Sequence, residues 1–143
     1  MILLKEWRFD MISIDKITNS DKLYCLDSVF CWSNIKYIDS IDYRILYDDC
    51  YESYSLIKIG LIYVEKNSTY NIVFEFYNTQ NIYINRLGGK YNQILGFEII
   101  DKSKDGWCDD QRYQINDYED NTISFSCEDI KVLSVEKKEI YYI

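Results

Sequence analysis

The sequence contains no histidine and no proline, and each absence narrows what the protein can be. Histidine is the commonest general base and the usual imidazole ligand of metals, so its absence excludes Ser–His and Cys–His nucleophiles. Proline is a common protection for the exposed edges of β-sheets, so charged side chains must serve there instead. Gly88, Gly89 and Lys90 lack the spacing of a phosphate-binding GxxxxGK[ST] loop. The sequence therefore predicts no enzyme and no cofactor.

Long apolar runs and paired cysteines are missing as well. No stretch approaches the ~18 apolar residues of a membrane span, and the opening MILLKEWRFD does not form a secretory signal. The five cysteines are an odd number and none forms a CxxC pair. This usage predicts reduced, mostly buried thiols in a cytoplasmic protein, without a zinc site. The 143 residues fit one domain spanning 1–143.

Alternation of apolar and polar residues is the main structural signal that is present. It predicts inward faces formed by Ile57, Ile59, Leu61 and Tyr63 in a strand over 56–65, and by Tyr70, Ile72, Phe74 and Phe76 in a strand over 69–77. Further strands are predicted over 41–47, 81–87 (Ile82 and Ile84 inward), 95–100, 112–116, 122–127 and 130–135. Residues before 34 are less regular, with a strand or helix at 2–9 and a short helix within 21–32.

Short loops between these strands favour antiparallel pairing, because parallel strands need crossovers of a dozen residues or more. The predicted fold is therefore mainly β, an antiparallel meander that forms a sandwich or a partly open barrel, with room for one short N-terminal helix.

Acidic residues concentrate between Glu98 and Asp129, where ten acids face three bases and the net charge is −7, against −8 for the whole chain. Such a charge disfavours nucleic acid and anionic membranes as partners and favours a basic protein. Aromatic residues stand among the acids, as in many interface hot spots. The predicted partner-binding residues are Asp101, Asp105, Trp107, Asp109, Asp110, Asp117, Tyr118, Glu119 and Asp120.

Other interpretations of the loop 101–112 are weaker. Asp101, Ser103, Asp105, Gly106 and Asp109 match the spacing of a calcium loop, but Arg112 occupies the place of the closing glutamate. No metal site is therefore predicted, and Arg112 is expected to pair with the neighbouring acids. Trp107 either covers the core or stands exposed as an anchor for a partner.

Several short motifs in the last third of the chain resemble those of small bacterial immunity proteins. They are Gly96–Asp101, Gly106-Trp107, Arg112-Tyr113, Asp117–Glu119, Ile123–Phe125 and Cys127-Glu128. Such proteins neutralise polymorphic toxins, including those of contact-dependent growth inhibition. The resemblance implies a cytoplasmic, non-enzymatic protein that binds a cognate toxin C-terminal domain and blocks its active site or substrate-binding surface. A basic nuclease would suit the acidic residues. The alternatives are a non-catalytic β-sandwich interaction module and a small-ligand-binding barrel.

Overall fold

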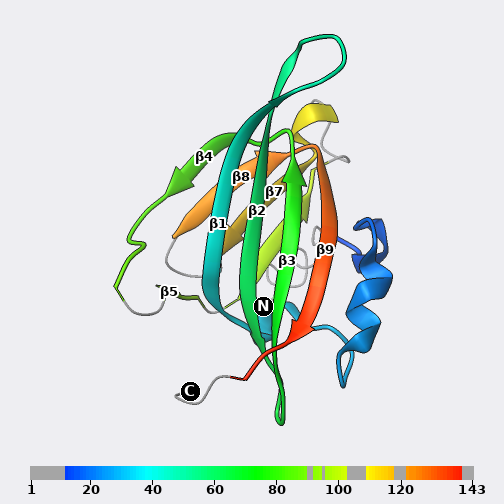
Figure 1. Cartoon of the computed structure of the whole chain (residues 1–143), viewed down its shortest axis with the longest axis vertical. Coiled ribbons are helices and arrows are strands. Elements are labelled where there is room, and N and C mark those ends of the chain that lie inside the picture. Colours follow the sequence, from blue (N-terminus) through cyan, green and yellow to red (C-terminus); the bar gives the residue numbers. More distant parts are fainter. Residues whose placement is uncertain (1–11, 90–91, 95, 103–108, 118–121, 140–143) are drawn as a thin grey trace, which may run out of the picture.

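Two antiparallel β-sheets pack face to face in a computed structural model that describes residues 12–89, 92–94, 96–102, 109–117 and 122–139 (Figure 1). One sheet has five strands in the order β5 (Asn92–Gln93), β1 (Ile35–Tyr47), β2 (Ser53–Val64), β3 (Thr69–Tyr77) and β9 (Asp129–Lys137). The other has four strands in the order β4 (Gln80–Ile84), β8 (Ile123–Cys127), β7 (Tyr113–Asp117) and β6 (Phe97–Asp101). The predicted β architecture is confirmed, and the sheets form a sandwich rather than a closed barrel.

The chain runs as a meander only within parts of each sheet. β1, β2 and β3 are consecutive neighbours, and so are β6, β7 and β8, because antiparallel strands need only a hairpin between them. The chain changes sheet after β3, returns briefly for β5, and changes again after β8 so that β9 pairs with β3. The predicted meander therefore holds for each run of three strands but not for the whole chain.

The core lies between the two sheets and contains the apolar faces that the alternation predicts. Ile57, Ile59 and Leu61 of β2 are fully buried, as are Ile72, Phe74 and Phe76 of β3. Across the sandwich, the rings of Phe76 and Phe125 meet edge to face with centroids 5.0 Å apart. Each such side chain contributes about 1.5–3 kcal/mol by leaving water. The strand faces predicted for 56–65 and 69–77 are confirmed.

The face predicted for the strand at 81–87 is wrong. Ile82 and Ile84 were expected inward, but they are 37% and 42% exposed. β4 pairs with β8 through a register irregularity between Gln80 and Tyr83, where Asn81 has a φ of 55°. This left-handed residue interrupts the alternation and turns the edge strand away from the core.

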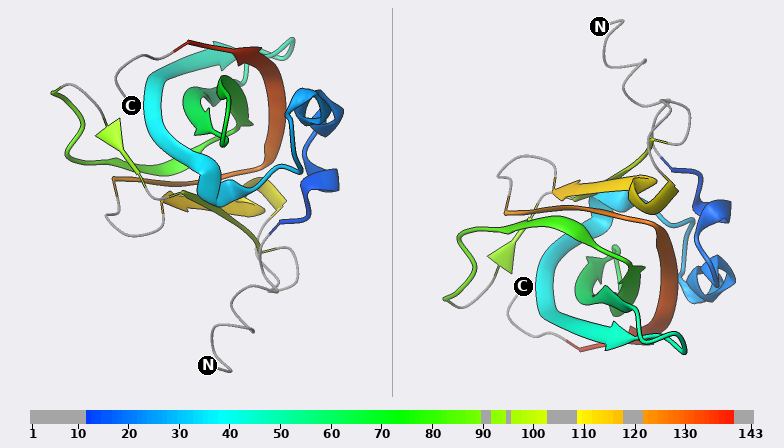
Figure 2. Two further views of the ribbon diagram at one scale, coloured as in Figure 1. Left: turned by 90° about the horizontal axis from the view of Figure 1, so that it is seen from below. Right: turned by 90° about the horizontal axis from the view of Figure 1, so that it is seen from above.

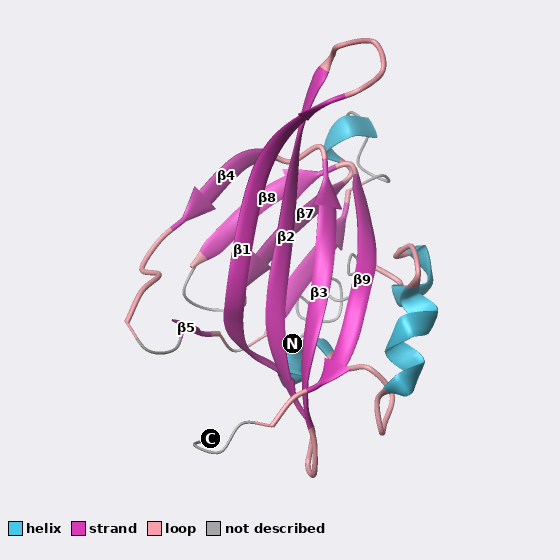
Figure 3. Ribbon diagram, viewed as in Figure 1, coloured by secondary structure: helices cyan, strands magenta, loops and turns pink. Residues whose placement is uncertain are grey.

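Residues 12–34 form three short 3-10 helices, η1 (Ile14–Lys16), η2 (Ser20–Cys25) and η3 (Trp32–Asn34), of which η2 meets the prediction of a short helix within 21–32 (Figure 3). Ile17, Leu23 and Leu26 of this region are buried against the sheets. The strand or helix predicted at 2–9 lies outside the described residues. No helix in the described part of the chain is long and apolar enough to cross a bilayer.

The sheet edges differ in how they are covered. Thr18 closes the β9 edge: its N–H donates to the carbonyl of Ile130 at 3.0 Å, and its carbonyl accepts from the N–H of Val132 at 2.9 Å. At the β6 edge, the N–H of Ile12 donates to the carbonyl of Ile99 at 2.8 Å. η2 packs beside β9, so the N-terminal segment covers one side of the sandwich (Figure 2).

On the opposite side of the sandwich, the described residues leave the strand edges largely uncovered. On the edge of β1 that faces away from β2, β5 pairs only with Tyr37 and Ile38, and no described strand covers this edge from Ser40 to Tyr47. β4 is the edge of the second sheet on the same side (Figure 1). Among the described residues, the uncovered backbone is thus concentrated along the outer edges of β1 and β4.

Candidate functional site

Two of the predicted partner-binding acids are buried and bonded within the protein. The carboxylate of Asp101 lies 2.6 Å from the Lys16 ammonium, and the Asp101 side chain is only 9% exposed. Asp117 is buried too, and its carboxylate accepts the N–H of Ile123 at 3.0 Å. The first bond ties η1 to β6, and the second ties the end of β7 to the start of β8. These contacts give both acids a structural role.

Asp110 is the predicted acid whose side chain is described and only partly buried. It lies in the 3-10 helix η5 (Asp109–Gln111), and its carboxylate accepts from the Gln80 amide at 3.1 Å. Gln111 donates to the other end of the same Gln80 amide at 3.1 Å, which fixes η5 on the start of β4. The guanidinium of Arg112 lies 5.6 Å from the centre of the Tyr113 ring, and the expected pairing of Arg112 with the neighbouring acids stays a prediction.

The remaining predicted residues are Asp105, Trp107, Tyr118, Glu119 and Asp120, which lie outside the described residues, as does the side chain of Asp109. The two loops that hold them start from opposite ends of β7, which has five residues and spans about 16 Å. Partner binding by the predicted residues stays a prediction. The two loops count as two separate candidate regions for that binding.

A second acidic and aromatic region, which sequence reasoning missed, lies in the hairpin between β1 and β2. β1 and β2 continue past the sandwich, and their hairpin projects at one end of the molecule (Figure 1). Tyr43, Ile45 and Tyr47 share the face of the buried Ile57 but are 49%, 49% and 69% exposed, because the second sheet does not reach them. We call residues 39–52 the acidic arm.

The tip of the acidic arm is a closed turn built on Asp48. Its carboxylate accepts the N–H groups of Cys50 and Glu52 at 2.8 and 3.0 Å, and its own N–H donates to the Glu52 carbonyl at 3.0 Å. Tyr51 has a φ of 62° and is 89% exposed. A tyrosine in the left-handed region is uncommon and costs about 1–3 kcal/mol, so the surrounding bonds hold it there.

The arm carries five acids and one base, a net charge of −4. With −7 between Glu98 and Asp129, the rest of the chain is left with +3, so the acids occupy two segments rather than one. Arg44 lies 3.0 Å from Asp42, and this hydrogen bond lowers the pKa of the Asp42 carboxyl. Asp49 and Glu52 are exposed and have no side-chain partner among the described residues. The sequence did contain a signal for this region. In DYRILYDDCYE, apolar and polar residues first alternate as in a strand, and acids stand at both ends.

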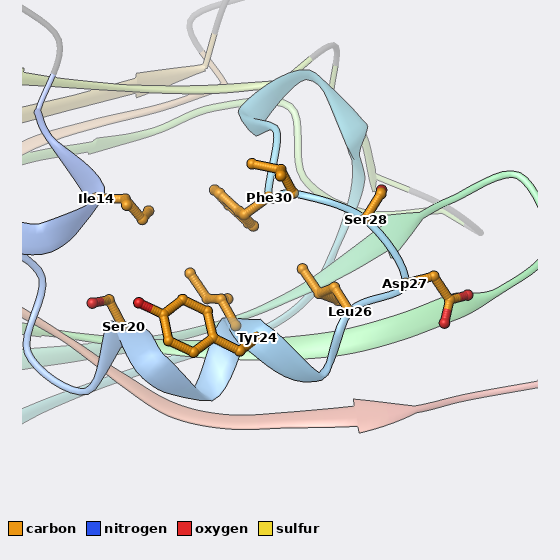
Figure 4. Close-up of a pocket in the computed structure, with 9 residues that line it drawn as sticks. Ile14, Ser20, Tyr24, Leu26, Asp27, Ser28 and Phe30 are labelled. Carbon is orange, nitrogen blue, oxygen red and sulfur yellow. The ribbon is translucent and has the colours of Figure 1, made fainter.

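An apolar pocket of about 400 Å³ opens on the other side of the sandwich, between η1, η2 and residues 26–30 (Figure 4). Ile14, Leu23, Leu26 and Phe30 form its apolar walls. The carboxylate of Glu65, itself buried, accepts the N–H groups of Asp27 and Ser28 at 3.0 and 3.2 Å and the Ser28 hydroxyl at 2.8 Å. These bonds fix one wall, and the irregular sequence before residue 34 gave no sign of the pocket.

The described cysteines are one buried thiol and three free, exposed thiols. Burial strongly raises the pKa of the Cys127 thiol, which keeps it protonated and unreactive. Cys25, Cys31 and Cys50 are free and exposed, so the prediction of mostly buried thiols is wrong for these three, while Cys108 lies outside the described residues. The described residues contain no cluster of three or more side chains suited to hold a metal ion.

Comparison with protein families decides between the remaining interpretations. A family model described as Immunity protein PIM8 matches residues 13–133. The chain belongs to the PIM8 family of immunity proteins. The match covers both sheets up to the middle of β9, and it also covers the 3-10 helices, whereas the predicted resemblance rested on motifs in the last third of the chain. No curated protein and no solved structure matches the chain.

Membership of the PIM8 family confirms the predicted resemblance to immunity proteins and gives the chain an immunity function with a cognate toxin as its partner. Such a protein needs a surface for its toxin rather than reacting groups. The described surfaces of this PIM8 member that suit a partner are η5 around Asp110 and the acidic arm.

Proposed function

We propose that this PIM8 member binds a basic toxin domain, a nuclease, in the cytoplasm and blocks its active site or its substrate-binding surface. The observation that carries the proposal is the net charge of −8 in a member of an immunity family. A nuclease holds the phosphate backbone with lysine and arginine side chains, and an acidic protein competes for that surface. Contact-dependent growth inhibition is one delivery route that would bring such a toxin into the cytoplasm.

Electrostatic complementarity acts mainly on the rate and specificity of binding. A cluster of like charges on one partner speeds association by about 10- to 1000-fold and rejects partners of the wrong sign. The acids of the loop 101–112 are proposed to supply part of this attraction, with Trp107 as an anchor. Asp110, at the described end of that loop, is only partly buried.

The alternative of a small-ligand-binding barrel is not supported, because the sheets form a sandwich whose interior is filled by aromatic and branched side chains. The alternative of an interaction module without a toxin is less consistent with the family, whose members are immunity proteins.

The test looks for a toxin gene beside the gene of this protein and uses the C-terminal domain of that toxin. The protein should co-purify with that domain and protect cells that express it. The double variant Asp109→Lys and Asp110→Lys should slow association about ten-fold at low salt, with a smaller effect at high salt. The matched control is Asp15→Lys with Asp21→Lys, the same charge change at exposed sites of η1 and η2.

A protein that neither binds nor protects against that toxin would contradict the proposed function. Binding with an unchanged association rate in the Asp109 and Asp110 variant would leave the function intact and remove the loop 101–112 from the contact.

A further inference from the structure

The outer edge of β1, on the side away from β2, has no described partner strand from Ser40 to Tyr47. Within the described residues, β5 covers this edge only at Tyr37 and Ile38, while β1 continues to Tyr47. The backbone groups that face outward from such an edge can pair with the backbone of another extended chain. The register irregularities of β1 lie before Ser40, so the strand pairs regularly with β2 from Ser40 to Tyr47. A regular edge of this length is a template for one more strand.

Other edges of the sandwich do not offer the same template. The β9 edge is occupied at Thr18 and the β6 edge is contacted by Ile12. β4 is open but short and interrupted by its irregularity at Gln80–Tyr83. Proteins commonly disable exposed edges in these ways, and the sequence has no proline to do so in β1. The β1 edge therefore stands out as the one long regular edge left open within the described chain.

The face of β1 beside this edge is apolar. Tyr43, Ile45 and Tyr47 follow one another at every second residue and all remain at least 49% exposed. Single exposed apolar residues are normal, but a row of them along one strand is typical of an interaction surface. Tyr51 adds another exposed ring at the tip, where the bonds around Asp48 hold it in its left-handed conformation.

Charge decides what kind of chain can occupy the edge. The arm has a net charge of −4 and the whole protein −8, so a second copy would bring like charges together along the edge. An extended segment with lysine or arginine beside apolar residues would instead pair with Asp49 and Glu52, whose side chains have no partner among the described residues. That composition agrees with a basic toxin.

We infer that the acidic arm receives an extended, cationic segment of the toxin, which adds to the edge of β1 as a further strand. This inference rests on the proposed function and specifies the contact. The backbone of Ser40–Tyr47 supplies the pairing, the row Tyr43, Ile45 and Tyr47 contacts apolar side chains of the segment, and the acids of the tip attract its bases. This added strand holds the toxin so that the acidic arm lies beside the basic surface of the toxin.

The decisive variants place a lysine in the row. Ile45→Lys and Tyr47→Lys each put a positive charge beside the edge, a device by which natural edge strands avoid pairing. Both positions are about half exposed or more, so the lysine ammonium reaches water and folding is retained. Each variant should weaken binding of the neighbouring toxin domain by roughly 30-fold or more, the size of an interface hot spot.

The matched control is Tyr24→Lys, the same exchange at an exposed tyrosine of η2 on the β9 side of the sandwich (Figure 2). It should leave the affinity within about two-fold of the unmodified protein, as expected for a surface residue outside the interface. Thermal unfolding of all three variants within a few degrees of the unmodified protein shows that the fold is kept.

The outcomes separate the inference from the proposed function. If the unmodified protein does not bind the toxin, the proposed function fails. If it binds and the two arm variants bind equally well, or Tyr24→Lys weakens binding as much as they do, the inference fails while the function stands. Sedimentation of the isolated protein as a dimer that Tyr47→Lys dissociates would also overturn it, because a second copy would then occupy the edge.

Discussion

The N–H of Tyr51 donates to the carbonyl of Asp48 at 3.0 Å, and this turn holds Tyr51 in a left-handed conformation with its ring in solvent. A left-handed backbone is unfavourable for a tyrosine, and an exposed ring gains nothing from the core. The position therefore works against the stability of the free protein. We therefore propose that Tyr51 contacts the toxin in the complex, which would account for a tyrosine at the tip of the acidic arm.

Tyr51→Asn is expected to change stability and binding in opposite directions. Asparagine tolerates the left-handed region, so the free energy of unfolding should rise by about 0.5–1 kcal/mol. Toxin binding should weaken at least ten-fold, because the ring is lost. Denaturant unfolding and titration calorimetry measure the two effects. Tyr24→Asn, at an exposed position of η2, should change neither, and a Tyr51 variant that binds normally would remove the ring from the interface.

Lys16→Met should destabilise the protein without affecting toxin binding. The change leaves Asp101 without its ammonium partner, and the expected loss is about 1 kcal/mol because the lysine side chain is half exposed. In the background of Asp101→Asn the same change should cost less, which a double-mutant cycle measures. Asp101→Asn weakening toxin binding ten-fold at unchanged stability would instead place Asp101 in the interface.

Glu98→Gln should stabilise the protein at neutral pH but not at acidic pH. Glu98 is buried in β6, and burial raises the pKa of its carboxyl above the ordinary value of 4.5. The folded protein then binds the proton more tightly than the unfolded chain, so stability falls as the pH rises through the raised pKa. Glutamine carries no charge and avoids this loss. We expect a gain of about 1 kcal/mol at pH 7, roughly 3 °C in Tm.

The control for Glu98 is the same measurement at about pH 3, below the ordinary and the raised pKa, where the carboxyl is almost fully protonated in both states and the two proteins should unfold alike. A constant difference between Glu98→Gln and the unmodified protein across this range would show that ionisation of Glu98 does not limit stability. Glu128→Gln, at a half-buried site that bonds to Asn78 at 3.3 Å, should show no gain at either pH.

The fold was predictable from the sequence wherever one strand face meets the core along its whole length. The residues 69–77 alternate without a break and form β3 with the predicted bounds. The prediction fails where tertiary contacts replace alternation. Thr18 closes the β9 edge by two backbone bonds that leave no mark on side-chain type, and Asn81 turns β4 outward within an apolar run.

The site was less predictable, because a count of acids does not show which carboxylates face water. Asp101 and Asp117 stand in an acidic stretch but are buried and bonded to Lys16 and to the N–H of Ile123. The acidic arm shows the converse case. Its residues read as an ordinary strand, and only the length of the second sheet leaves Tyr43 and Tyr47 in solvent.

Hydrogen–deuterium exchange of the protein with and without the neighbouring toxin domain tests most directly whether the toxin binds as an added strand. In the free protein, the amides of Ser40–Tyr47 that face the open edge should exchange rapidly. In the complex, they should become protected, while amides of η2 keep their free rates, because only backbone pairing at the edge covers these groups. Unchanged exchange of Ser40–Tyr47 in a complex that binds tightly and protects cells would contradict toxin binding at the acidic arm.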